Sequence, residues 1–309
     1  MRFMWLNAMV IFMFGLVWLS QPVIAQDDFS AEPEIVVTES SESAQLDTPT
    51  DDSTAQDSEA DDAKAEESDL EDELAEITDD YFTQVEDYRD VERRYIIARE
   101  TYYQNNTLAA QEEAIRQAQF LMIARSTVLE TYFEYLQKSL DQTLGIELED
   151  KVLMNNRLAK VRTDLEESLV DAGKDRNRFQ INEAFTALNA QQKELTAIAY
   201  ETLALVKIGQ LQNALDQATI SREMISSWLE SAQTTEANRI KKQRGLEEVD
   251  HLIQSAKNNL TEVNTKWRLQ AGTNRFSESS YRTFQENSEY TYLQLRQALA
   301  FMEEIVRTP

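Results

Sequence analysis

The side chains that could do chemistry are few, and their clearest spacing is Glu248-Val249-Asp250-His251. A Glu-x-x-His spacing lets one helix offer two ligands to a di-iron site, but such sites use two copies and this chain has one. The apolar residues around it recur in steps of three and four, so Leu246 and Val249 take heptad positions a and d. His251 then takes position f, which points away from a bundle core. We therefore expect a solvent-exposed His251, no metal and no cofactor.

The composition removes most other catalytic arrangements. The 309 residues include no cysteine and one histidine, so thiolate chemistry is excluded and His251 would have to supply any histidine base. Adjacent acidic pairs such as Glu166/Glu167 point about 100° apart on a helix and do not face each other as an acid and a base must. Neither a phosphate-binding glycine loop nor a Gly-x-Ser-x-Gly motif occurs. We expect a protein that is not an enzyme.

The elements that position these side chains are long helices. No proline occurs from Asp51 to Thr308, and a proline costs a helix interior about 3 kcal/mol. The clearest heptad pattern is an apolar seam formed by Leu246, Val249, Ile253, Ala256, Leu260, Val263 and Trp267. The sequence predicts an all-α fold: an elongated antiparallel helical bundle, or coiled coil, of about six long helices preceded by a disordered acidic tail.

Turn signals divide the Pro-free stretch into helices. The first helix is expected to begin between Leu70 and Asp80 and to end at Asn105-Asn106-Thr107. Further helices are expected to run to about Thr143, from Glu147 to Ala172, and from Arg178 to Ala232, with a loop or polar helix end between Ser231 and Gly245. The last helix is expected to begin near Ser277 and to bury Tyr281, Phe284, Tyr292, Leu295, Leu299, Met302 and Ile305.

The acidic residues concentrate near the N-terminus. The chain carries a net charge of −26, and residues 26–80 hold 22 Asp and Glu against one Lys. Such a composition buries too little apolar surface to fold, so residues 26–75 are predicted to be a disordered, acidic, low-complexity linker. The helical bundle is predicted to occupy 76–309, either as one body or as two stacked sub-bundles, 76–209 and 210–309.

Residues 1–25 have the pattern of a signal peptide. Arg2 precedes an apolar stretch over 3–19, followed by Pro22 and small or apolar residues up to Ala25. We expect an exported protein that is periplasmic, on the cell surface or secreted. The alternative is an uncleaved membrane anchor, because the apolar stretch approaches the length of a membrane span. No membrane insertion is expected beyond this leader.

Two groups of side chains are candidates for partner binding. Tyr81, Tyr88, Tyr95 and Tyr102 stand seven residues apart, and Tyr103 adjoins them. They form either a core seam whose phenols reach water at the bundle edge, or an aromatic face for a partner or a glycan. Arg239, Lys241, Lys242 and Arg244 form the densest basic cluster. This cluster is either an exposed helix end or a patch that binds the acidic tail or an acidic partner.

The function that these features favour is structural. We expect an exported, non-enzymatic helical structural or adapter protein that mediates protein–protein contacts, with a protein partner or a second copy of itself. The alternative is a holdase-like or ligand-sensing helical binding module outside the cytoplasm. Nucleic acid is not an expected partner, because the chain is strongly acidic.

Overall fold

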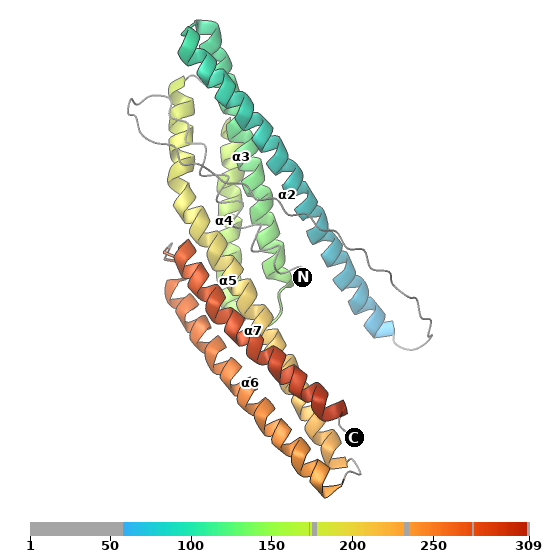
Figure 1. The fold of residues 1–309 in the computed structure, drawn as a ribbon. Helices are drawn as coiled ribbons and strands as arrows, with labels where there is room; N and C mark the ends of the chain where they lie inside the picture. Colours follow the sequence, from blue (N-terminus) through green and yellow to red (C-terminus); the bar gives the residue numbers. More distant parts are fainter. Residues whose placement is uncertain (1–57, 173, 175–177, 232–234, 274, 308–309) are drawn as a thin grey trace. The chain divides into compact units, whose positions relative to one another are not determined.

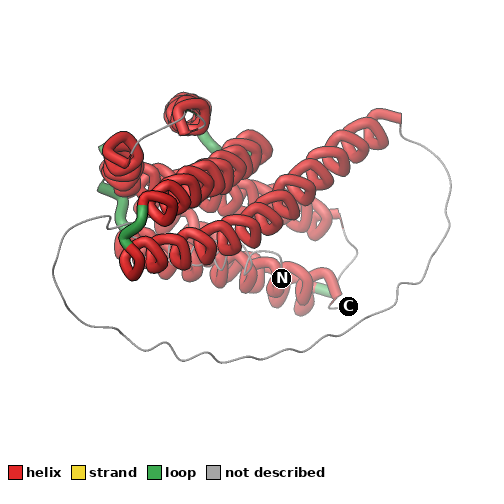
Figure 2. The backbone as a smooth tube through the Cα atoms, turned by 90° about the horizontal axis from the view of Figure 1, so that it is seen from above, coloured by secondary structure: helices red, strands yellow, loops and turns green. Residues whose placement is uncertain are grey.

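Six helices make up the described chain. The computed structural model describes residues 58–172, 174, 178–231, 235–273 and 275–307. In chain order the helices are α2 (Ser58–Asn105), α3 (Leu108–Gln142), α4 (Leu148–Ala172), α5 (Arg178–Ser231), α6 (Glu236–Gln270) and α7 (Glu278–Arg307) (Figure 1). Viewed from above, the described elements are all helices, with no strand among them (Figure 2). The predicted all-α helical bundle is confirmed.

The predicted turns lie where the polar and glycine residues indicated. Asn106 has a φ of 45°, the left-handed geometry that ends a helix. Thr107 then caps α3 by accepting a hydrogen bond of 3.3 Å from the backbone N–H of Ala110. Asn and Thr thus have separate roles in one sharp turn, and the predicted ends of the helices on either side are confirmed.

One predicted helix start was wrong, and one prediction that left two alternatives open is resolved. α2 begins at Ser58, before the predicted window of Leu70 to Asp80, because residues 58–70 are rich in Ala and Glu, which favour helix. α5 ends at Ser231 and α6 begins at Glu236, so residues 236–245 are the polar helix end that was one of the two predicted alternatives. Thr235 caps this helix by accepting a hydrogen bond from the backbone N–H of Asn238.

The chain divides into two compact units, Met1–Glu73 and Leu74–Pro309. The predicted leader 1–25 and most of the predicted linker 26–75 lie outside the described residues. Residues 58–75 of that linker belong to α2. The predicted sub-bundles 76–209 and 210–309 stay a prediction.

Helix α5 is the central element of the second unit. Its N-terminal part contacts α3 and α4, and its C-terminal part contacts α6 and α7 (Figure 1). Consecutive helices run antiparallel, so α5 and α7 run in the same direction. Every residue of the segment 197–206 is buried. A helix that is buried on all sides has its neighbours on every face, so this segment joins the two sets of helices.

The turn between α3 and α4 packs directly on α5 at Gly209. A Cβ atom on Gly209 would lie 2.8 Å from the carbonyl oxygen of Leu144 and 2.4 Å from Cγ1 of Ile146. A Cβ atom on Gly145, in the turn itself, would lie 2.4 Å from the carbonyl oxygen of Gly209. Two glycines therefore allow the backbones of turn and helix to touch, which explains why a glycine interrupts the long apolar run of α5.

The seam of α6 is as predicted, but that of α7 is not. Buried positions in α6 include Leu246, Val249, Ala256, Leu260, Val263 and Trp267. In α7 the buried positions are Tyr281, Phe284, Ser288, Thr291, Gln294, Leu295, Ala298, Met302 and Ile305. The predicted burial of Tyr292 and Leu299 was wrong, because Ser288, Thr291 and Ala298 continue the heptad steps in their place.

Candidate functional site

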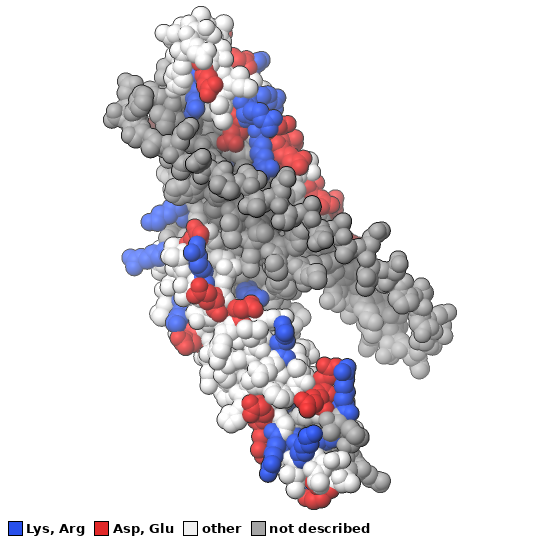
Figure 3. Space-filling view, in the orientation of Figure 1, with Lys and Arg blue, Asp and Glu red and all other residues white. Residues whose placement is uncertain are grey.

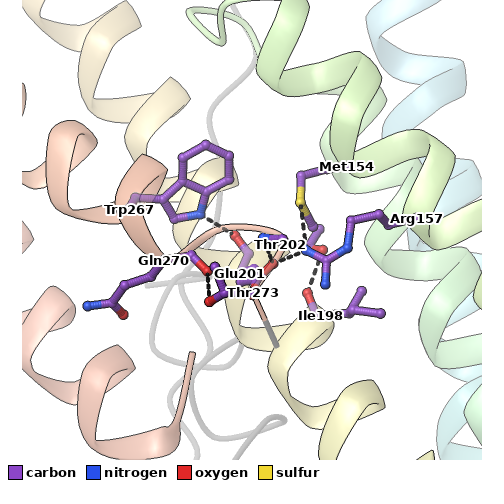
Figure 4. A network of polar contacts seen from close by, with 9 residues as sticks. Met154, Arg157, Ile198, Glu201, Thr202, Trp267, Gln270 and Thr273 are labelled. Carbon is purple, nitrogen blue, oxygen red and sulfur yellow. Dashed lines mark hydrogen bonds and ion pairs between the residues drawn. The ribbon is translucent and has the colours of Figure 1, made fainter. Parts of the chain in front are cut away.

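A buried carboxylate, Glu201, lies in the middle of α5 (Figure 4). Its Oε2 atom forms an ion pair with Nη1 of Arg157 from α4 and accepts a hydrogen bond of 3.2 Å from the backbone N–H of Gly272. The indole Nε1–H of Trp267 donates to the backbone carbonyl of Glu201 over 2.9 Å. Helices α4 and α5 and the turn after α6 therefore meet at one acidic residue.

The positions of Glu201, Trp267 and Gly272 follow from ordinary features of helices and turns. Glu201 is the one charged residue of the fully buried segment 197–206. Trp267 is the last residue of the α6 seam, and Gly272 in the following turn has a φ of +77°, which glycine adopts without strain. The sequence-based prediction missed this site. The available signal was a lone acidic residue within an otherwise uncharged run.

A second set of ion pairs secures the same end of α6. Nη2 of Arg268 lies 2.6 Å from Oδ2 of Asp150 and 2.5 Å from Oε2 of Glu147. Hydrogen bonds to these carboxylates, that to Asp150 first, raise the pKa of Arg268. Because the Arg268 side chain is largely exposed, each pair contributes at most about 1 kcal/mol. The ion pairs orient the helix end and add little to stability.

The Glu201 site is suited to fixing how three elements pack. Its Oε1 atom has no hydrogen-bond partner among the described residues. No group of three or more His, Cys, Asp or Glu side chains in the described ranges could hold a metal ion. A buried ion pair specifies a packing arrangement because separating the partners is costly. We infer that Glu201 and Arg157 hold the register of α4 against α5.

Two cavities flank this site. One, of about 190 Å³, lies between α4 and α5 and is lined in part by Arg157 and Gly272. The other, of about 290 Å³, lies between the end of α6 and the start of α7 and is lined in part by Trp267 and Gln270. The lining of the first cavity combines apolar side chains with charged side chains of both signs.

The tyrosine row lies mainly inside the protein. Tyr81, Tyr88 and Tyr95 are buried, Tyr102 is half-buried and Tyr103 is exposed. The ring of Tyr81 contacts that of Tyr132 in α3, and the ring of Tyr95 lies 6.5 Å from that of Phe185 in α5. The described surface therefore carries no face made of all five tyrosines. A role of this row in partner binding stays a prediction.

The expectation that the phenols of the row reach water is wrong for Tyr81. The hydroxyl oxygen atoms of Tyr81 and Tyr132 are buried, with no hydrogen-bond partner among the described residues. Tyr200 from α5 and Tyr281 from α7 stack with ring centroids 5.0 Å apart. Burial raises the pKa of Tyr132 far above its usual value, and Tyr81, Tyr281 and Tyr200 add to this rise. Tyrosines of four helices thus share one interior region.

Alkaline pH is expected to destabilise this region. Burial, first among the causes, raises the pKa values of Tyr200 and Tyr281 to about 12. Tyrosine in an unfolded chain has a pKa of about 10. Above that pH the unfolded chain therefore loses protons that the folded chain keeps. The free energy of unfolding should therefore be unaffected by these groups below pH 10 and should fall as pH rises towards 12. Urea unfolding followed by circular dichroism across this range measures the fall.

Single Tyr-to-Phe variants provide the control for the alkaline effect. Tyr200→Phe and Tyr281→Phe each remove one buried ionisable group, so stability should fall less steeply with pH in either variant. Tyr290→Phe, at a side chain 56% exposed, should leave the slope unchanged. Equal slopes in all three variants and the parent chain would show that ionisation of Tyr200 and Tyr281 does not cause the loss of stability at alkaline pH.

The basic cluster is divided between surface and core. Arg239, Lys241 and Arg244 are exposed. Lys242 is 3% exposed, and its Nζ lies 4.8 Å from the ring centroid of Trp228 in α5. An ammonium group over an indole face is a favourable cation–π contact. The predicted exposed patch of four cations is therefore corrected to three, because Lys242 continues the α6 seam four residues before Leu246. Anion or tail binding by this patch stays a prediction.

The segment with the Glu-x-x-His spacing contributes to packing through its two inner residues, Val249 and Asp250. His251 is exposed while Val249 is fully buried, as the heptad positions predict. Asp250 forms two hydrogen bonds, of 2.6 and 2.5 Å, with the guanidinium of Arg222 in α5. The acidic residue inside the motif therefore joins α6 to α5.

No protein family model, curated protein or solved structure matches this chain. None of the helices in the described ranges combines the length and the apolar character that a bilayer crossing demands.

Proposed function

We propose that this protein is an exported, non-enzymatic helical adapter that mediates protein–protein contacts outside the cytoplasm. One observation carries the adapter part of the proposal: apolar side chains stand on the outer surface of α7 at heptad spacing. The export part rests on the signal-peptide pattern of residues 1–25. The non-enzymatic part rests on the absence of cysteine and on the exposed position of the single histidine.

The apolar stripe of α7 consists of Tyr292, Leu299 and Val306, which are 44%, 48% and 52% exposed. Residues seven apart on a helix lie on one side and are about 10 Å apart, so the stripe extends about 20 Å. In the space-filling view an uncharged area covers part of α6 and α7, between groups of charged side chains (Figure 3). An apolar stripe on the exposed side of a helix is a candidate surface for binding another protein.

A second apolar stripe lies on α5. Ile220, Met224 and Trp228 are four residues apart and are each at least two-fifths exposed. The inward residues of the same stretch, Leu215, Ala218 and Leu229, are buried. This part of α5 therefore has apolar residues on two sides, whereas a surface helix with one neighbouring core needs only one apolar side.

The partner that fits such stripes is an amphipathic helix. Side chains at heptad spacing pack into the holes of a facing helix with the same repeat. α5, α6 and α7 already contact one another, and the buried residues of α6 and α7 follow heptad steps. We propose that the α7 stripe accepts one further helix, from a protein partner or from a second copy of this chain.

Site-specific photo-crosslinking in the native host tests the adapter function. A photoreactive amino acid at Leu299 should give a crosslink to one stoichiometric partner, or to a second copy of the chain. The same group at Lys257, exposed on α6, should give little. The substitution Val306→Glu should abolish the Leu299 crosslink while leaving the circular dichroism spectrum unchanged, because position 306 is half-exposed.

Other crosslinking results would reject the adapter function. Equal crosslinking from Leu299 and Lys257 would show that α7 has no specific partner surface. Crosslinks to many unrelated, partly unfolded proteins would favour the holdase-like alternative.

A further inference from the structure

The cavity of about 190 Å³ between α4 and α5 has an apolar wall with polar groups at its edges. The wall consists of two buried side chains from each helix: Val161, Leu165, Leu195 and Ile198. Gly272, in the turn after α6, contributes backbone to the lining. Five of the ten lining residues are polar or charged, so the cavity suits a ligand with both polar and apolar parts. Its volume is below the usual range of about 300–1,000 Å³, which restricts the ligand to a small molecule.

The positively charged side chains around the cavity lie towards one end, and the negatively charged side chains lie towards the other. Arg157 pairs with Glu201, so this part of α4 lies beside position 201 of α5. Because the two helices are antiparallel, later residues of α4 lie beside earlier residues of α5. Arg157 and Lys160 therefore lie towards one end, and Asp164 lies towards the other with Glu194. Lys160 and Asp164 are four residues apart, about 6 Å along the helix axis.

Three of these charged side chains are available to a ligand. Lys160 and Asp164 are four residues apart, a spacing at which opposite charges can pair on a helix. No ion pair within the described ranges joins them, and none involves Glu194. Arg157 is occupied by Glu201, so Lys160 is the cation that we assign to a ligand carboxylate. Asp164 and Glu194 are the acceptors that we assign to a ligand ammonium group.

We propose that this cavity binds a small zwitterion whose carboxylate and ammonium groups are separated by an apolar spacer, as in an ω-amino acid. An α-amino acid carries both charges next to each other, so it would reach only one end of the cavity. A dicarboxylate would place a negative charge against Asp164 and Glu194, and a diamine would place a positive charge against Lys160. The site is independent of the α7 stripe and of the adapter function.

Selective ¹⁵N-glycine labelling of the full chain tests this site with 6-aminohexanoate as the probe. The chain has six glycines, so the spectrum contains few signals, and Gly272 is the one that lines the cavity. The signal missing in Gly272→Ala identifies it. Titration should shift the Gly272 amide saturably and leave Gly145 and Gly245 in place. No shift at Gly272 up to the solubility limit of the probe would overturn the proposal.

Ligand and residue controls distinguish a zwitterion site from a general apolar one. Hexanoate, hexan-1-amine and adipate should each bind at least about tenfold more weakly than 6-aminohexanoate, since each lacks one correctly placed charge. Lys160→Gln and Asp164→Asn should each weaken probe binding by roughly threefold to tenfold. Lys257→Gln, on α6 and outside the cavity lining, should leave probe binding unchanged. Equal binding of hexanoate and the probe, or full binding by both cavity variants, would overturn the assignment.

Discussion

Replacing Arg157 by methionine is expected to lower the free energy of unfolding by about 3–5 kcal/mol. The substitution keeps an unbranched side chain but leaves the fully buried carboxylate of Glu201 without its cation. The backbone N–H of Gly272 would then be the one remaining described donor to Oε2, and Oε1 already has none. Urea unfolding followed by circular dichroism measures the loss.

A double-mutant cycle separates the ion pair from simple packing. Arg157→Met/Glu201→Gln removes both charges and keeps an oxygen that can accept from Gly272, so it should be more stable than Arg157→Met alone. The matched control is Arg282→Met, which breaks an exposed pair with Glu278 and should change stability by less than about 0.5 kcal/mol. If Arg157→Met were as mild as Arg282→Met, the buried pair would not hold the helices together.

The glycines of the α3–α4 turn are expected to be nearly irreplaceable. Gly145→Ala should cost about 3 kcal/mol or more, because it adds left-handed strain at φ +79° to a clash with the backbone of Gly209. Gly209→Ala should lower the free energy of unfolding by somewhat less than Gly145→Ala does. Alanine favours helix by about 1 kcal/mol, but its Cβ would meet the carbonyl oxygen of Leu144, and a backbone atom cannot move aside as a side chain does.

Gly272 is the matched control for backbone strain. Its φ of +77° is nearly that of Gly145, yet a Cβ atom there would meet nothing within 4 Å. Gly272→Ala should therefore show the strain alone, about 1 kcal/mol. The difference in unfolding midpoint between the Gly145 and Gly272 variants then measures the close approach of turn and helix. Equal midpoints would mean that the backbones of the turn and of α5 are not in close contact at Gly145.

The fold followed from the sequence where large apolar residues mark one side of a helix. The α6 seam is such a case: six of the seven predicted residues are buried, and Trp267 ends it. In α7 the same reasoning failed, because the buried side includes Ser288, Thr291 and Ala298. Size and hydrophobicity selected Tyr292 and Leu299, whereas the heptad steps pass through the small residues. Close helix packing can bury small polar side chains whose hydrogen bonds are made locally, as Thr291 does with the carbonyl of Asn287.

The Glu201 site could not be predicted in the same way. Its members lie on α4, on α5 and at the end of α6, far apart in sequence, and no pattern within one helix shows that Arg157 and Gly272 meet Glu201. Lys242 was misplaced for a similar reason: a lysine is rarely buried, and its contact with Trp228 depends on how α5 and α6 pack. Residues whose role arises between helices need the tertiary structure to identify them.

The full burial of residues 197–206 also limits how this chain can vary. Ala197 and Ala204 are seven residues apart and lie on one side of α5, and Ala199 lies on another side. All three are buried, and a larger side chain at any of them would have to displace its neighbours. Selection in a lineage of such proteins would then retain small residues at these three positions and at Gly209 and Gly145. The charged residues of the surface would be free to vary. Distant relatives would share a spacing of small residues within one long helix more than they share its hydrophobic residues.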